Sequence, residues 1–243
     1  PSRGLGDVYK RQPLYGDVAP QILNLNMGAP FQPFSRAPQI RYRYKTGDIQ
    51  ITGAALWQSQ YLSQGPEGKS QKYIKNSCVP EIYAGIDYKH KGLLIGAGIE
   101  MVSLTPRTQA TVEDKIYKVS ERITSLSYEV HMKYNSEKWL VAAKSVLGSN
   151  LTQTSMLGGY GIKSIDPRTG EQEYSPNRNS SSWINIVYGK TWKPAIFFGY
   201  MKNLGTSDAV TNMYGTGTNV DQLLSGTAEL TYNCLLYTSP SPR

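Results

Sequence analysis

The chain has 243 residues and a formal net charge of +8, with no block of like charges along it. Such a mild and dispersed charge gives little support to nucleic-acid binding. The longest apolar run, residues 93–99, is far shorter than the ~20 residues of a membrane helix, so no helix is expected to span a membrane.

The two ends of the chain are related to each other at the nucleotide level. Back-translation of CLLYTSPSPR, residues 234–243, gives a sequence whose complementary strand, read one frame over, encodes SRGLGDVYKRQ, residues 2–12. Both ends resemble translated sequencing-adapter sequence, so we set 1–12 and 234–243 aside as non-native tails. The remaining residues, 13–233, are expected to be a fragment that is open at both ends and carries no information about a signal peptide.

Setting the tails aside changes the composition. The first twelve residues carry a net +2 and the last ten a net +1, which leaves +5 on residues 13–233. Cys78 remains as a single cysteine, which cannot form an internal disulfide or a thiolate cluster. His90, interpreted as a solvated turn residue, and His131 are the only imidazoles. We therefore expect no metal site and no cofactor.

Alternation of apolar and polar residues predicts roughly nine or ten strands and no helix of useful length. In chain order the readable strands cover 40–45, 49–61, 82–89, 93–101, 125–134, 139–147, 182–189, 195–203 and 222–232. The clearest is 125–134, where Tyr128, Val130 and Met132 alternate strictly with Glu129, His131 and Lys133.

The connections between these strands alternate between short and long. The short ones centre near residues 47, 91, 137 and 191, and the long ones cover about 62–78, 103–120, 149–180 and 204–221. In an antiparallel meander, consecutive connections lie at opposite ends of the sheet. The pattern therefore predicts short turns on one rim and long loops on the other, which is typical of an outer-membrane β-barrel.

Tyrosine and tryptophan suit boundaries between apolar and polar surroundings, and the chain has 18 Tyr and 4 Trp against 4 Phe. Six of them lie within about two residues of a short turn, as an aromatic girdle at a membrane interface requires: Tyr44, Tyr88, Tyr134, Trp139, Tyr188 and Trp192. Trp57 and Tyr61 lie toward the opposite end of their predicted strand, where the second girdle is expected. A soluble β-sandwich would also alternate, but it has no reason to place an aromatic residue beside every short turn.

Four segments resemble a known family. They are PFSRAPQIR at 33–41, SLTPR at 103–107, MLGGY at 156–160 and FGYMKNLG at 198–205. These segments resemble general and DcaP-like porins of Gram-negative outer membranes, and the resemblance spans nearly all of 13–233. It implies a diffusion channel, usually trimeric, with one loop folded into the barrel to narrow it.

Charged side chains that face lipid near the bilayer midplane cost ~2–4 kcal/mol each, so those on polar strand faces are expected to line a lumen. The predicted pore-lining residues are Arg41, Arg43, Glu81, Lys89, Glu100, Glu129, His131, Lys133, Lys144 and Lys202. Arg41 and Arg43 share a strand face that carries no acidic residue, which favours an anion-selective lumen. The alternative is that Glu81, Asp87, Glu100 and Glu129 pair with the cations and leave a nearly neutral wall.

His131, with Glu129 and Lys133, could also be interpreted as an acid–base cluster. These residues are two apart on one strand face, where any polar lumen wall would place them, and no nucleophile is fixed near them by sequence. We therefore predict pore lining and no catalytic residue. Cys78, at a loop–strand junction, is interpreted as inert.

The combined prediction is an all-β protein, an incomplete antiparallel transmembrane β-barrel with up-and-down topology. Its strands are too few for a general pore of ~16–18 strands. The expected function is that of a porin, integral to an outer membrane and in contact with its lipid. It would pass small hydrophilic, anion-leaning solutes as a homotrimer. The alternatives are an outer-membrane barrel enzyme and a soluble β-sandwich that binds carbohydrate.

Overall fold

The computed structural model describes residues 18–23, 25 and 28–233. The proposed adapter-like tails, 1–12 and 234–243, lie outside the described residues. Within the described part of the chain, no helix is long and apolar enough to cross a membrane.

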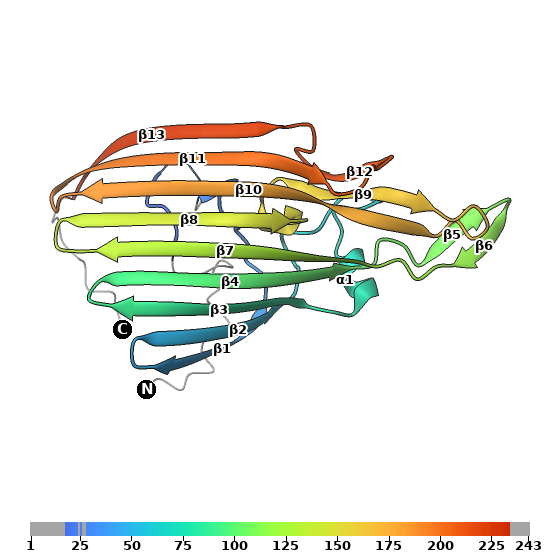
Figure 1. The fold of residues 1–243 in the computed structure, drawn as a ribbon, viewed down its shortest axis with the longest axis horizontal. Coiled ribbons are helices and arrows are strands. Elements are labelled where there is room, and N and C mark those ends of the chain that lie inside the picture. The colour runs from blue at the N-terminus through green and yellow to red at the C-terminus, as the bar shows by residue number, and fades with distance from the viewer. Residues whose placement is uncertain (1–17, 24, 26–27, 234–243) are drawn as a thin grey trace, which may run out of the picture.

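One antiparallel sheet dominates the described residues, and its main path follows the chain in the order β1-β2-β3-β4-β7-β8-β10-β11-β13 (Figure 1). The strands of this path are β1 Gln39–Thr46, β2 Ile49–Leu56, β3 Glu81–His90, β4 Leu93–Leu104, β7 Ile123–Asn135, β8 Trp139–Ser149, β10 Gln172–Tyr188, β11 Trp192–Thr206 and β13 Gln222–Tyr232. The sheet is open, with β1 and β13 as the two ends of the path. The predicted fold class, an all-β meander that forms an incomplete barrel, is confirmed.

The two rims of the sheet differ as predicted. The short turns after β1, β3, β7 and β10 lie together at one end, and the long connections lie at the other (Figure 1). Because each strand pairs antiparallel with its neighbour in the path, every second connection returns to the same rim.

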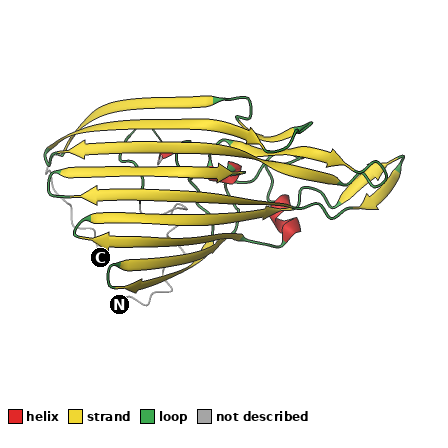
Figure 2. Ribbon diagram, viewed as in Figure 1, coloured by secondary structure: helices red, strands yellow, loops and turns green. Residues whose placement is uncertain are grey.

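The long connections contain more regular structure than we predicted. They hold α1 Lys72–Ser77, the hairpin of β5 Gln109–Val112 and β6 Lys115–Lys118, the short 3-10 helix Thr152–Thr154, β9 Gly158–Ile165 and β12 Met213–Thr216 (Figure 2). In addition, β10 begins at Gln172 rather than near residue 182. Residues 172–181 are mostly polar on both faces, so their sequence shows no alternation of apolar and polar residues. They form a strand because residues 172–177 pair with β9 and residues 178–181 pair with β8 and β11.

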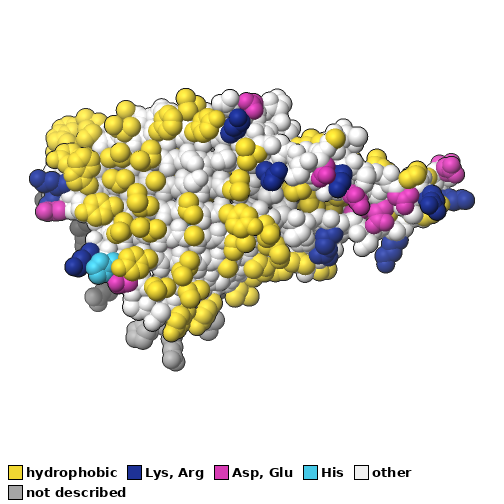
Figure 3. All heavy atoms as spheres, in the orientation of Figure 1, with side chains coloured by type: hydrophobic (Ala, Val, Ile, Leu, Met, Phe, Trp, Pro, Cys, Tyr) yellow, Lys and Arg dark blue, Asp and Glu magenta, His cyan; other side chains and the backbone are white. Residues whose placement is uncertain are grey.

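The sheet is apolar on its outer face and polar over much of its inner face. On β7, Tyr128 and Val130 are 48% and 56% exposed, whereas Glu129 between them is 2% exposed. Hydrophobic side chains cover the middle of the visible face, and charged side chains gather at its two ends (Figure 3). A soluble protein of this topology would place its apolar faces inside, so the side-chain pattern is that of a sheet whose outer face meets an apolar environment.

Candidate functional site

A row of inner-face residues crosses the middle of the sheet. Asp87 on β3 pairs with Gly96 on β4, Gly96 pairs with His131 on β7, and His131 pairs with Lys144 on β8. Inward-pointing side chains at these positions face the same space because paired residues share one face of a sheet. Glu129 lies two residues before His131 and therefore on the same face.

These side chains form a connected network, which we call the inner-wall cluster: Tyr83, Asp87, Glu129, His131 and Lys144. His131 Nε2 lies 2.9 Å from Asp87 Oδ1, and His131 Nδ1 lies 3.3 Å from each carboxylate oxygen of Glu129. Lys144 Nζ is 3.5 Å from Glu129 Oε2. The Tyr83 hydroxyl donates a hydrogen bond of 2.9 Å to Glu129 Oε1. The imidazole therefore bridges two carboxylates, one of which also receives a lysine and a phenol.

Glycines give these side chains room to lie flat along the wall. A Cβ on Gly96 would collide with Asp87 Oδ1 and His131 Nε2, and a Cβ on Gly85 or Gly98 would collide with the Tyr83 hydroxyl. The Asp87–His131 contact reaches across β4 at Gly96, and the Tyr83–Glu129 contact reaches across it at Gly98. The glycines of β4 are thus part of what permits the cluster.

Gly96→Ala is expected to destabilise the protein by about 1–3 kcal/mol, because the added methyl group forces the Asp87–His131 pair apart. The measurement is the urea midpoint of the detergent-folded protein. Gly53→Ala on β2 is the matched control, since a Cβ there meets nothing within 4 Å. Equal midpoints for the two variants would contradict the packing of this pair across β4.

The cluster is buried, and its cationic and anionic side chains contact one another. The side chains of Glu129 and Lys144 are 0% exposed, and those of His131 and Asp87 are 6% and 13% exposed. Lys144 is held by Glu129, which compensates its charge locally. The two ring nitrogens of His131 contact the carboxylates of Glu129 and Asp87. These contacts fix the orientation of the imidazole along the inner wall.

Most other predicted pore-lining residues also lie on the inner face. Arg41 and Arg43 pair with Ala54 and Thr52, both buried on that face. Glu81 is buried and accepts a hydrogen bond of 2.6 Å from Gln58 Nε2. Three further predicted pore-lining residues lie on the inner face. Glu100 is buried, and Lys89 and Lys133 are half-buried.

Lys202 is an exception, and its predicted orientation was wrong. It is exposed and pairs with Gln222, while its neighbour Met201 is 1% exposed on the inner face. Both faces of β11 are apolar, with Phe197 and Met201 inside and Phe198 outside. The polar side of this strand therefore cannot be recognised from alternation alone. Lys202 lies near the loop end of the strand, where a long side chain can carry its charge into water.

The six aromatic residues predicted beside the short turns are all between 42% and 58% exposed. Trp139 and Tyr188 lie on paired positions of β8 and β10, with ring centroids 4.6 Å apart. Trp192 makes a contact of the same length with Tyr232. Three of the six, Trp139, Tyr188 and Trp192, therefore lie in ring pairs along the turn rim, an arrangement that would suit an aromatic girdle.

The second predicted girdle takes a different form. β2 ends at Leu56, so neither Trp57 nor Tyr61 lies in a strand. Trp57 packs against the buried cluster that contains Tyr73, and Tyr61 makes an edge contact with Phe34 at a centroid distance of 5.5 Å. Both are partly buried in the loop layer. The prediction placed them in a strand because the alternation of 49–61 continues past Leu56, where the backbone leaves the sheet.

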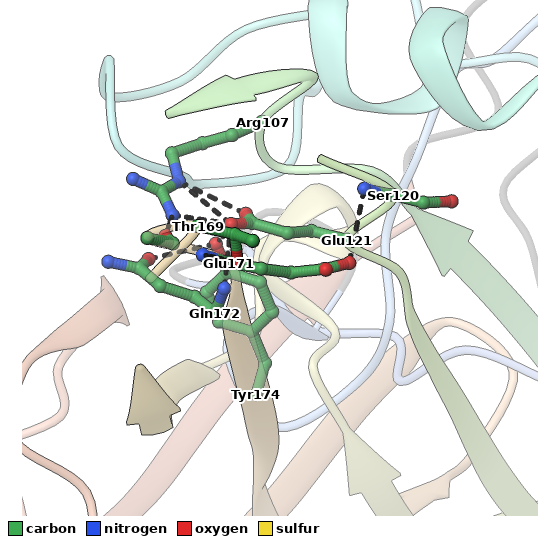
Figure 4. A network of polar contacts seen from close by, with 8 residues as sticks. Arg107, Ser120, Glu121, Thr169, Glu171, Gln172 and Tyr174 are labelled. Carbon is green, nitrogen blue, oxygen red and sulfur yellow. Dashed lines mark hydrogen bonds and ion pairs between the residues drawn. The ribbon is translucent and has the colours of Figure 1, made fainter. Parts of the chain in front are cut away.

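A second polar network lies among the long loops, and sequence reasoning missed it (Figure 4). Glu121, whose side chain is 0% exposed, accepts hydrogen bonds from Arg107, from the Tyr174 hydroxyl and from the Gln172 amide. Arg107 also donates to the Gly170 carbonyl oxygen at 2.6 Å. The network ties the base of the β5–β6 hairpin to the start of β10. It stabilises the structure of the loops.

Protonation in this loop network follows from its contacts. The hydrogen bond to Glu121 raises the pKa of the Arg107 guanidinium. Burial, with the hydrogen bond to Glu121 second, raises the pKa of the Tyr174 phenol. Arg107 is therefore charged and Tyr174 neutral at physiological pH, and the network keeps its donors. No sequence signal links residues so far apart as Arg107, Glu121 and Tyr174.

No protein-family model matches this chain, and no curated protein matches it. Among solved structures, the fold is similar to the crystal structure of the outer membrane channel DcaP of Acinetobacter baumannii, with a TM-score of 0.60 and 16% sequence identity. The similarity covers 93% of this chain and 58% of that chain, so the chain spans little more than half the length of the channel that it matches. The chain is therefore an open β-sheet whose fold is similar to part of that solved structure.

Proposed function

We propose that this chain is part of an outer-membrane porin, a passive diffusion channel for small hydrophilic solutes. The observation that carries the proposal is the inverted sheet, with an apolar outer face bounded by exposed Tyr and Trp at the turn rim and an ion-paired inner face. The solved structure with a similar fold is an outer membrane channel, which supports the same assignment. Outer-membrane lipid, small solutes and a homotrimer are the proposed partners, and the outer membrane is the proposed location.

The proposed mechanism is diffusion without a chemical step. A lumen whose wall carries charged and hydroxyl side chains stays hydrated, and a hydrated passage admits small polar solutes. Lys144 and Glu129 are buried together and compensate each other, so they leave no isolated charge that would bind one solute tightly. No cofactor and no energy coupling are part of the proposal.

Detergent dependence of the purified chain tests the membrane assignment. We expect strand-rich circular dichroism and a monodisperse size in detergent, and aggregation when the detergent is removed, because the outer face exposes residues such as Val130, Ile196 and Leu224. A folded, monodisperse product without detergent would exclude a membrane barrel and favour a soluble β-sandwich. Swelling of liposomes by small sugars, with the chain extended to the full length of its gene, then tests the channel itself.

Anion preference is a finer proposal, and we assign it to Arg41 and Arg43 on β1. Both have the inner-face orientation, and fixed cations along a lumen raise the local concentration of anions. The Debye length is ~8 Å at physiological salt, so these charges should bias permeability rather than gate it.

Replacing Arg41 and Arg43 with Gln is expected to shift the reversal potential toward cations under a salt gradient in planar bilayers. Conductance should stay of the same order, because the side-chain volume changes little. Lys202→Gln is the matched control, since Lys202 is exposed on the outer face of β11. An unchanged reversal potential in the double variant would mean that selectivity is set elsewhere along the passage.

A further inference from the structure

Part of the inner wall is apolar, which does not suit a surface that faces water. On β8, β10 and β11, the inner-face residues Ala142, Val146, Trp183, Phe197 and Met201 form one buried cluster. Each is at most 3% exposed. Leaving one large apolar side chain of this kind in water costs ~1.5–3 kcal/mol, so a hydrated lumen requires that this wall be covered.

The chain just before β1 covers it. Residues 28–38, which we call the inner segment, place Phe31 in this cluster with 1% exposure. The Phe31 and Phe197 ring centroids lie 6.0 Å apart, and the Ser181 hydroxyl donates a 2.7 Å hydrogen bond to the Phe31 carbonyl oxygen. Gly199 leaves the space that the ring uses, since a Cβ there would lie 2.8 Å from Phe31 Cγ.

Residues further upstream lie against the same side of the sheet. The Gln21 amide donates to Asn185 Oδ1 at 2.8 Å, and the Leu23 amide donates to a Glu229 carboxylate oxygen at 3.0 Å. Val18 is fully buried in the cluster of Phe31. Residues 18–23 therefore lie against the same inner face of the sheet as the inner segment.

The inner segment then runs along the same face of the sheet, away from β10 and β11 and toward β2. Phe34 donates its amide to the Thr154 carbonyl oxygen at 2.7 Å and packs on Tyr61 in the loop layer. Ala37 is buried against Ala54 and Leu56 of β2. Since β2 and β11 lie near opposite ends of the strand path, residues 31–37 span the concave side of the sheet. Figure 1 shows this blue part of the chain behind the strands.

We propose that the inner segment, residues 28–38, is the element that narrows the channel, docked in the lumen by the apolar wall of β8, β10 and β11. The channel part of this statement rests on the proposed function, whereas the docking part does not. Phe31 is the anchor, and Gly199 is the specific feature of the wall that admits it. Charges of the inner-wall cluster are not needed for the docking, because the residues that hold Phe31 are apolar.

Accessibility of a wall residue beneath the segment tests the docking. Ser181, which is 0% exposed and bonded to Phe31, is replaced by Cys in a background with Cys78→Ser and Cys234→Ser. The rate of labelling by a charged, water-soluble maleimide is measured in detergent. We expect slow labelling in this background, and labelling about tenfold or more faster after Phe31→Ala or Gly199→Val, because a covered site reacts through local opening.

Gly226→Val is the matched control, since Gly226 lies on the neighbouring strand β13 with open space around its Cβ position. It should leave the labelling rate unchanged, and circular dichroism and unheated gel migration should show that every variant is folded. Phe31→Ala acts by removing the anchor and Gly199→Val by filling its space, so one remains informative if the other fails to fold. Fast labelling before either change, or equal rates in all variants, would overturn the docking.

Conductance separates this inference from the proposed function. With the chain extended to full length, Phe31→Ala should raise single-channel conductance, and Gly226→Val should not. Faster labelling together with an unchanged non-zero conductance would overturn the assignment of the constriction to this segment. Absence of any conductance in every variant, with faster labelling intact, would overturn the porin assignment and leave the docking established.

Discussion

Val130→Arg is expected to abolish assembly of the barrel, whereas His131→Arg is expected to be tolerated. Val130 is 56% exposed on the outer face, in the middle of β7, and an arginine near the bilayer midplane costs ~2–4 kcal/mol. His131 lies one residue further on the inner face, between the carboxylates of Asp87 and Glu129, which can accept hydrogen bonds from a guanidinium.

The measurement is the yield of folded protein in detergent and its insertion into lipid vesicles. The two variants introduce the same side chain at adjacent positions, so each serves as the control for the other. Equal tolerance at both positions would show that the two faces of β7 are not distinguished by lipid. Loss of folding for His131→Arg alone would mean that the assigned orientation of β7 is wrong, with His131 facing outward and Val130 inward.

Lys144→Met is expected to lower the free energy of unfolding by roughly 3–5 kcal/mol, the usual cost of breaking a buried ion pair by removing one partner. Lys144 and Glu129 are both 0% exposed, and their charged atoms lie 3.5 Å apart. Without the lysine, Glu129 keeps contacts to Tyr83 and His131 but loses a full opposite charge in a buried site.

The double variant Lys144→Met with Glu129→Gln should recover much of this loss, because neither charge is then buried alone. Urea unfolding in detergent, read as a double-mutant cycle, gives the coupling energy between the two positions. Lys133→Met is the control, since Lys133 is a half-buried lysine on the adjacent strand. A coupling energy near zero would mean that the charges of the inner-wall cluster are independent of one another.

Features that depend on neighbouring residues were predicted correctly. Alternation along 125–134 placed Val130 outside and Glu129 inside, because parity within a strand is a local property of the chain. The short turns and the aromatic residues beside them were also recognisable, since a turn and its flanking residues are adjacent in sequence. The predicted order of strands followed from the lengths of the connections.

Features that depend on pairing between distant segments were not predictable in the same way. Asp87 meets His131 only because β3, β4 and β7 are in a particular register and because Gly96 between them has no side chain. The start of β10 is a strand because β9 pairs with it, although its residues do not alternate. The inward side of β11 is apolar because the inner segment covers it, which made Lys202 appear to face the lumen.

The sequence by itself determined the class of fold, the outward faces of the clear strands and the rim beside which exposed aromatic residues gather. Each of these follows from a periodicity of two and from the chemistry of residues next to turns. The tertiary structure alone decided which charges pair, where Trp57 and Tyr61 pack, and which segment fills the concave side. These outcomes depend on cross-strand register and on the space left by glycines such as Gly96 and Gly199, and neither can be found from alternation along a single strand.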